Sequence, residues 1–173
     1  SSHSQISYAV FCLKKKQESF RPFAPSVLKE DSHAYFSMEN ESPYMLVVAP
    51  VTAAIREEGA PRRSLGCIND IRSDLPAITH VDFSARVQTV TESRNSRYAR
   101  LLKAFRARTG CSVLVNTSFN VRGEPIVCTP EEAFRCFMRT EIDVLVLGSC
   151  VLFKSEQGAL SETTDWRAEI PLD

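Results

Sequence analysis

The sequence lacks several features that would place a protein in a well-known class. No apolar run approaches the roughly 18 residues needed to cross a membrane, so no membrane partner is expected. Acidic and basic residues balance, with 21 of each and a formal net charge of zero, which argues against nucleic acid as the main partner. Neither a GxGxxG motif nor a P-loop is present. The two commonest phosphate-binding loops are therefore excluded.

Cysteine spacing argues against a further group of proteins. None of the six cysteines belongs to a CxxC pair, and most of them lie within apolar runs. We therefore predict buried thiols in a reduced, cytoplasmic protein. The alternative interpretation of these cysteines is a disulfide framework or a zinc site. Our prediction itself assigns no metal-binding residues. The six residues are Cys12, Cys67, Cys111, Cys128, Cys136 and Cys150.

Segments typical of strands and helices alternate along the 173 residues, which predicts one mixed α/β domain with a largely buried sheet. Residues 1–5 are interpreted as an expression scar or a cut end, and residues 155–173 as a polar tail. The predicted strands are residues 6–13, 44–51, 85–90, 112–115, 125–128, 143–148 and 150–154. Of these, strand 44–51 is predicted to be buried, and strand 85–90 to have one wet, solvent-facing side. The predicted helices are residues 26–36, capped by Ser26, residues 95–109, ended by Gly110, and residues 129–139, opened by Thr129 with Glu132 at the capping-box position. Residues 56–76 are predicted to form a long mobile loop.

A polar turn, NTSFNVRGEP, joins the predicted strands 112–115 and 125–128. Asn116, Ser118 and Asn120 alternate, so their side chains point one way if the strand continues. Arg122 adds a permanent charge that suits phosphate or carboxylate. This turn follows a strand end, where α/β sheets commonly bind ligands. The alternative is an ordinary turn whose Asn and Ser side chains cap its own backbone.

Two other polar segments have a comparable position. KKKQESFRPFAPS follows the first predicted strand and contains Lys15 and Arg21, and Arg86 lies within THVDFSARVQTV. Solvated surface charge is the alternative interpretation of both. Together, the three segments indicate a pocket for a phosphorylated ligand. The three histidines, His3, His33 and His80, are far apart in the sequence, so a Ser-His-Asp arrangement has no support.

Several sequence motifs resemble those of the carboxyl-terminal domain of the O-carbamoyltransferases, which modify nodulation factors, antibiotics and other natural products. These motifs are FRPFAPSVL, SPYMLVVAPV, LPAITHVDFSARVQTV, NTSFNVRGEPIVCTPEEAFRCF and IDVLVLG, and the resemblance runs from about Lys14 to Lys154. It implies a YrdC-like twisted mixed sheet with flanking helices. It also implies a partner, an amino-terminal actin-like ATPase-type transferase domain with a metal-binding histidine motif that this sequence lacks. The chain is then part of a longer two-domain enzyme, or one half of a split one.

The resemblance implies that this domain joins carbamoyl phosphate and ATP into carbamoyl adenylate, and that the other domain transfers the carbamoyl group to a hydroxyl. Mg²⁺ would accompany ATP as a co-substrate, and fixed cations would offset the crowded negative charge. A catalytically weakened YrdC-like nucleotide-binding or interaction module is the alternative. A tRNA threonylcarbamoyl-adenylate synthase is a more distant relative by fold, and the neutral charge disfavours it.

The resemblance also suggests which residues act. Arg86 and Ser118 are the candidate catalytic residues. The candidate substrate- and nucleotide-binding residues are Lys15, Arg21, Arg86, Asn116, Ser118, Asn120 and Arg122. The sequence departs from the family pattern at Gln17, where an arginine is usual, and at Phe83, where a glycine is usual. If that glycine adopts a positive φ or lets a ligand approach, Phe83 strains the turn or fills the space.

Overall fold

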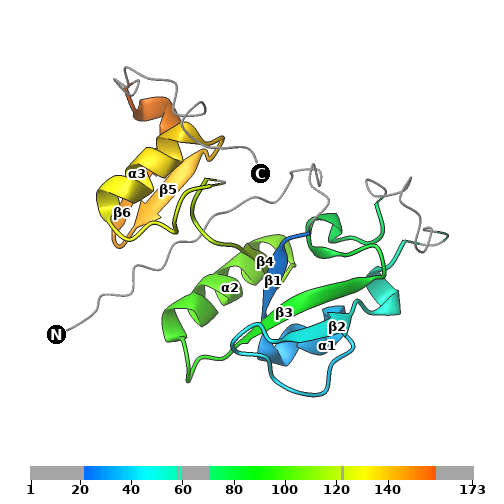
Figure 1. Ribbon diagram of the computed structural model, residues 1–173. Coiled ribbons are helices and arrows are strands. Elements are labelled where there is room, and N and C mark those ends of the chain that lie inside the picture. The colour runs from blue at the N-terminus through cyan, green and yellow to red at the C-terminus, as the bar shows by residue number, and fades with distance from the viewer. Residues whose placement is uncertain (1–21, 58, 60–70, 122, 159–173) are drawn as a thin grey trace. The chain divides into compact units, whose positions relative to one another are not determined.

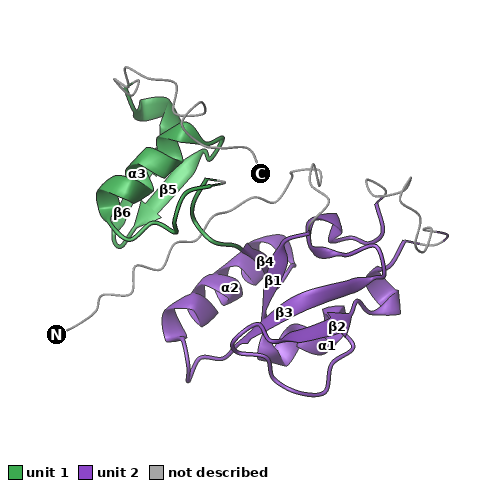
Figure 2. Ribbon diagram, in the orientation of Figure 1, with its two compact units in different colours: residues 1–11, 117–173 green, residues 12–116 purple. Residues whose placement is uncertain are grey.

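The computed structural model describes residues 22–57, 59, 71–121 and 123–158, and its fold is mixed α/β as predicted. The chain groups into two compact units (Figure 2), a larger one of residues 12–116 and a smaller one of residues 1–11 and 117–173. Compact units can be parts of one domain, so the predicted single domain over residues 1–173 stays a prediction. The predicted strand 6–13 lies outside the described residues.

A four-stranded sheet forms the centre of the larger unit (Figure 1) and has the order β2-β3-β1-β4. β1 runs parallel to β3, whereas the β2–β3 and β1–β4 pairs are antiparallel, so the sheet is mixed. The strands are β1 (Ala24–Leu28), β2 (Val47–Pro50), β3 (Ser84–Val90) and β4 (Val113–Asn116). β3 and β4 lie within a residue of their predicted positions.

The predicted helix 26–36 is wrong, because its first residues belong to the central strand β1. All five residues of β1 are buried, and Ser26 donates its hydroxyl to Gln88 Oε1 at 2.7 Å instead of capping a helix. The helical part is short and consists of a 3-10 turn, Lys29–Asp31, and α1, Ser32–Tyr35. Pairing with strands on both sides decides this conformation, and those partners lie more than 50 residues away in the sequence.

The predicted strand 44–51 is present in shorter form, but it is not buried. β2 is an edge strand of the sheet, and Leu46 and Val48 are largely exposed. Only alternate side chains of this segment, such as Ala49 and Val51, point into the core. An edge strand has one neighbour and one covered face, whereas the continuous apolar pattern of this segment predicted burial on both faces.

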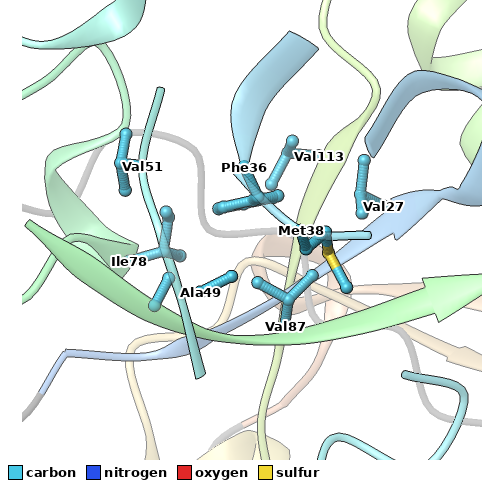
Figure 3. Close-up of a cluster of buried hydrophobic side chains, with 9 residues drawn as sticks. Val27, Phe36, Met38, Ala49, Val51, Ile78, Val87 and Val113 are labelled. Carbon is cyan, nitrogen blue, oxygen red and sulfur yellow. The ribbon is translucent and has the colours of Figure 1, made fainter. Parts of the chain in front are cut away.

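One face of the sheet packs on the main hydrophobic core of the larger unit. Phe36 comes from the end of α1, Ile78 from the short turn Pro76–Ile78, and both are almost completely buried. Figure 3 shows how side chains from separate segments converge in this core. Its buried members are Val27, Phe36, Met38, Ala49, Val51, Ile78, Ala85, Val87 and Val113.

α2 (Ser96–Thr109) covers part of the other sheet face, as its apolar periodicity predicts. The Asn95 side chain caps its first turn by accepting from the Tyr98 N–H at 3.1 Å, and Gly110 ends the helix at a φ of 77°. Leu102 packs there against Leu28 and neighbouring apolar residues. The remaining part of this face carries polar side chains and becomes important below.

The smaller unit contains α3 (Pro130–Arg139) and a hairpin of β5 (Val144–Leu147) and β6 (Cys150–Phe153). The predicted capping box is confirmed, since Thr129 and Glu132 bond each other's backbone N–H groups. The predicted strand 125–128 is wrong. The Val127 N–H donates to the Phe119 carbonyl and the Cys128 N–H donates to the Glu132 carboxylate, so neither is available for pairing with another strand.

The described cysteines are free, but the prediction of buried thiols holds only in part. Cys136 is buried, and burial raises the pKa of its thiol. Cys128 and Cys150 are exposed because one lies in an irregular loop and the other on a hairpin strand. No helix within the described ranges is both long and apolar enough to span a membrane.

The predicted loop 56–76 is ordered at both described ends. Arg56 and Ser73 form an isolated β-bridge, and Arg72 is almost fully buried. The prediction of a mobile loop is therefore wrong for residues 71–76, because Arg72 and Ser73 are buried, Leu75 packs against the core, and the backbone of this segment bonds to residues 55 and 57. Residues 60–70 lie outside the described ranges.

Asp31 links three segments of the larger unit. Its carboxylate accepts two hydrogen bonds from Arg106 Nη1, at 2.8 and 2.7 Å, and one from the Ser112 hydroxyl at 2.5 Å. Burial by itself raises the pKa of Asp31, but the hydrogen bonds from Ser112 and Arg106 and the charge of Arg106 outweigh it. The pKa of Asp31 is therefore lowered.

We expect Asp31→Asn to lower the free energy of unfolding by about 1–2 kcal/mol at neutral pH. Because the folded-state pKa is lowered, the stabilisation is present above the unfolded-state pKa of about 3.9 and is lost as pH falls through the folded-state pKa. Urea unfolding across pH 2–7 measures this. Glu30→Gln, at the exposed neighbouring residue, serves as the control and should change little. A constant difference between Asp31→Asn and the parent at all pH values would contradict the prediction.

Candidate functional site

The part of the sheet face that α2 does not cover contains a pocket of about 320 Å³. It lies where β1 and β3 begin, and Phe23, Ala24 and Val48 form apolar parts of its wall. Four polar residues also line it, namely His80, Asp82, Ser84 and Arg86. A small pocket with apolar walls and a few convergent polar groups is the usual form of a small-molecule site.

The alternation of β3 brings Arg86 to this pocket. Ala85 and Val87 face the hydrophobic core, so Ser84, Arg86 and Gln88 face the opposite side. Arg86 is exposed and pairs in register with Val48 of β2. The predicted strand with one wet face is therefore confirmed. The permanent charge of Arg86 is presented on an ordered strand rather than on a loose loop.

Gln88 joins three strands beside the pocket. Its Oε1 accepts one hydrogen bond from the Ser26 hydroxyl of β1, at 2.7 Å, and another from Asn116 Nδ2 of β4, at 2.6 Å. Its Nε2 donates to the Pro43 carbonyl at 3.1 Å. The half-buried Asn116 is thus held in one orientation at the carboxyl end of β4. This is the strand end at which the sequence predicted a polar site.

A tight turn at residues 80–84 shapes one side of the pocket. The Phe83 N–H donates to the His80 carbonyl and the His80 N–H donates to the Ser84 carbonyl, each at 2.9 Å. Phe83 has a φ of 64°, in the left-handed region that glycine usually occupies in turns of this kind. Its side chain is buried, with the Arg56 guanidinium 5.3 Å from the ring centre. The residue therefore strains the turn, and it is not among the residues that line the pocket.

His80, Asp82 and Ser84 interact within this turn. His80 Nδ1 lies 3.3 Å from Asp82 Oδ1, and the same oxygen accepts the Ser84 hydroxyl at 2.6 Å and the Ser84 N–H at 3.0 Å. Burial by itself raises the pKa of Asp82, but the bonds from Ser84 and the proximity of His80 hold it below its usual range. Asp82 is therefore an ionised acceptor.

Sequence reasoning missed this cluster because it compared the three histidines only with one another. The sequence signal that could have found it is the spacing H-x-D-x-S of His80, Asp82 and Ser84. Alternate residues around a turn can come to lie on the same side. The arrangement is nevertheless not a Ser-His-Asp triad, because the Ser84 hydroxyl is bonded to Asp82 and not to the imidazole.

The other predicted site residues are distributed over both units. Lys15, Arg21 and Arg122 lie outside the described residues. Ser118 is exposed in the smaller unit. Asn120, in the same unit, donates its amide to the carbonyls of Val121 and Glu124 at 3.0 Å each. For Asn120 the structure thus shows a turn-capping role, and β4 ends at Asn116 instead of continuing through the turn.

Arg86 and His80 thus line a small pocket in a mixed α/β domain, and the Gln88–Asn116 amide pair lies farther along the same strands. The family model described as carbamoyltransferase C-terminus matches residues 3–154, and the chain belongs to this family. The resemblance found in the sequence is thereby confirmed.

Three relatives illustrate the range of the family. The chain is 55% identical over 92% of its length to an uncharacterized protein of Synechocystis. It is 43% identical over 81% of its length to the nodulation protein NolNO of Sinorhizobium fredii. It is 42% identical over 65% of its length to the 3'-hydroxymethylcephem-O-carbamoyltransferase of Amycolatopsis lactamdurans. The matched region covers 26%, 19% and 18% of these three relatives, respectively, so the chain spans about a quarter of their length or less.

The strained turn generates a prediction about Phe83. We expect both Phe83→Ala and Phe83→Gly to lower the free energy of unfolding, because losing a buried Phe side chain costs about 3–5 kcal/mol. Phe83→Gly should be the more stable of the two by about 1 kcal/mol, since alanine keeps the left-handed strain. Urea unfolding of both variants measures the difference.

Val87→Ala and Val87→Gly provide the control pair, because Val87 is a fully buried residue of β3 without a positive φ. There the alanine variant should be the more stable one. Equal stabilities at residue 83 would contradict the assignment of backbone strain. A gain in ligand affinity in Phe83→Gly alone would show that Phe83 crowds the pocket.

Proposed function

We propose that this chain is the part of an O-carbamoyltransferase that forms carbamoyl adenylate from carbamoyl phosphate and ATP. Water takes the phosphoryl group of carbamoyl phosphate, and the carbamate oxygen then attacks the α-phosphorus of ATP while the bond to pyrophosphate breaks. Mg²⁺ accompanies ATP as part of the co-substrate. The observation that carries this proposal is the position of Arg86 in the pocket of a carbamoyltransferase-family domain.

Arg86 is suited to the α-phosphate. The attack brings two anionic groups together, and a guanidinium that is already in place offsets their repulsion and stabilises the charge that develops on the phosphate oxygens. Arg86 needs no proton transfer to do this, because its charge is permanent.

Asn116 is suited to the planar carbamoyl amide, which has donors and acceptors along one edge. Gln88 holds the Asn116 side chain in one orientation. The resemblance to the family assigns ligand contacts to further residues, which stay part of the proposal: Lys15, Arg21, Ser118, Asn120 and Arg122.

Transfer of the carbamoyl group to a hydroxyl is proposed for the remainder of a longer protein. The relatives are four to five times as long as the matched region, which leaves room for the amino-terminal actin-like transferase domain. By analogy with the nodulation and cephem relatives, the acceptor is the hydroxyl of a natural product. We place the reaction in the cytoplasm, where ATP is available.

A second candidate is a nucleotide-binding or interaction module that has lost the chemistry. The strained turn at Phe83, directly beside the pocket, favours it, because the family usually has a glycine there. Pyrophosphate release from ATP that depends on carbamoyl phosphate separates the two functions. A folded chain that binds ATP with Mg²⁺ but releases no pyrophosphate supports the module.

We expect Arg86→Ala to reduce carbamoyl-phosphate-dependent pyrophosphate release by about 10- to 150-fold, because it removes a charge-assisted contact worth roughly 1.5–3 kcal/mol. Its melting temperature should stay near that of the parent, since the Arg86 side chain is exposed. Arg86→Lys should restore little, because an ammonium group cannot form a bidentate fork. Arg97→Ala, at an exposed arginine of α2, is the matched control.

Ser118→Ala should reduce the same activity by about 2- to 13-fold, equivalent to a neutral hydrogen bond of about 0.5–1.5 kcal/mol. Its melting temperature should also stay near that of the parent. If Arg86→Ala and Ser118→Ala both keep the parental activity, the pocket is not the site of adenylate formation. A melting temperature lowered by Ser118→Ala without loss of activity would indicate that Ser118 only caps its turn.

A further inference from the structure

Among the described residues that line the pocket, two can carry positive charge, and only Arg86 has a role in the proposed function. The other is His80, whose side chain is partly exposed. A phosphoryl group is a tetrahedral dianion or monoanion, so several donors that approach it from different directions bind it better than one. His80 belongs to the turn before β3 and Arg86 to β3 itself, and the two residues line the same pocket.

The backbone of His80 is fixed at both of its polar groups. Its N–H donates to the Ser84 carbonyl and its carbonyl accepts from the Phe83 N–H. Ser84 is the first residue of β3, so the turn continues directly from the strand that carries Arg86. Binding of a ligand to both residues therefore costs little conformational entropy, because the turn is already ordered.

The ring of His80 is oriented by Asp82. Nδ1 lies 3.3 Å from Asp82 Oδ1, and Ser84 holds that oxygen with its hydroxyl and its N–H. Because Asp82 occupies Nδ1, Nε2 is the ring nitrogen left for a ligand. Asp82 is thus a positioning residue for the ring of His80.

We propose that His80 is a phosphoryl-binding residue of this pocket, oriented by Asp82 so that Nε2 contacts the phosphate. This rests on the proposed function for the identity of the ligand, which is either the phosphoryl group of carbamoyl phosphate or the terminal phosphates of ATP. The competing interpretation is purely structural, with His80 serving only as a partner of Asp82 in the turn.

Two substitutions separate the interpretations by replacing one ring nitrogen at a time. The amide nitrogen of Gln can take the place of Nε2, so His80→Gln should keep the ligand contact and weaken the contact with Asp82. The amide nitrogen of Asn can take the place of Nδ1, so His80→Asn should keep the contact with Asp82 and lose the ligand contact. If His80 binds phosphate, affinity falls about 10-fold in His80→Asn and less than about 3-fold in His80→Gln.

The probes are inorganic phosphate and magnesium pyrophosphate, added to the 173-residue chain at constant pH and ionic strength, with sodium chloride as the ionic-strength control. The chain has three histidines, so its imidazole signals are few enough to follow individually by NMR. We expect a saturable shift of the His80 ring signals and no shift at the exposed His33, whose replacement, His33→Gln, is the matched control. Calorimetry on the same samples gives the affinities.

Tighter binding of phosphate would assign His80 to carbamoyl phosphate, and tighter binding of pyrophosphate would assign it to ATP. No saturable shift at His80 with either probe overturns the proposal, and so does an affinity that His80→Asn preserves and His80→Gln loses. These results do not depend on turnover. A saturable shift in a chain that releases no pyrophosphate would leave the phosphoryl site intact and refute adenylate formation by this chain alone.

Discussion

The side chain of Gln88 provides the interaction on which the polar half of the sheet depends. Ser26 is completely buried in the central strand β1, and a buried hydroxyl without a partner costs about 1–3 kcal/mol. Gln88 accepts that hydroxyl and the Asn116 amide with one oxygen, and so links β3, β1 and β4. The same contacts hold Asn116 beside the pocket, so a requirement of folding also orders a candidate ligand-binding group.

The turn at residues 80–84 illustrates the opposite relation, in which local strain accompanies the site. Phe83 adopts a left-handed φ, and the burial of its ring beside Arg56 offsets the cost. The turn in exchange brings His80 and Asp82 to the wall of the pocket. A glycine here would adopt the same backbone without strain but would leave a space in the core. The departure from the family pattern therefore concerns the core of the larger unit first and the pocket only indirectly.

Elements with strong local signals could be predicted from the sequence. α2 has an apolar stripe, an Asn95 cap and Gly110 at its end, and α3 has a complete capping box, so both helices depend on contacts within a few residues. The polar alternation of β3 likewise placed Arg86 on the wet face. β1 could not be predicted, because its short apolar segment is compatible with either conformation and its strand partners lie far away in the sequence. The strand expected at residues 125–128 failed because Glu132 and Phe119 bind the backbone N–H groups that a sheet would need.

For the site, the sequence by itself determined which side-chain groups are available, namely those of Arg86, Asn116 and the other polar residues in the motifs that resemble the family. It also determined the family, because a long run of specific residues is present whatever the fold of the chain. Only the tertiary structure decided which of these groups meet. It bonded the Asn116 side chain to Gln88, bonded the Asn120 amide to the carbonyls of Val121 and Glu124, and brought His80 and Asp82 to the pocket of Arg86. The physical reason is that side-chain chemistry is local, whereas strand pairing and hydrogen-bond partners are settled between segments that are distant in the sequence.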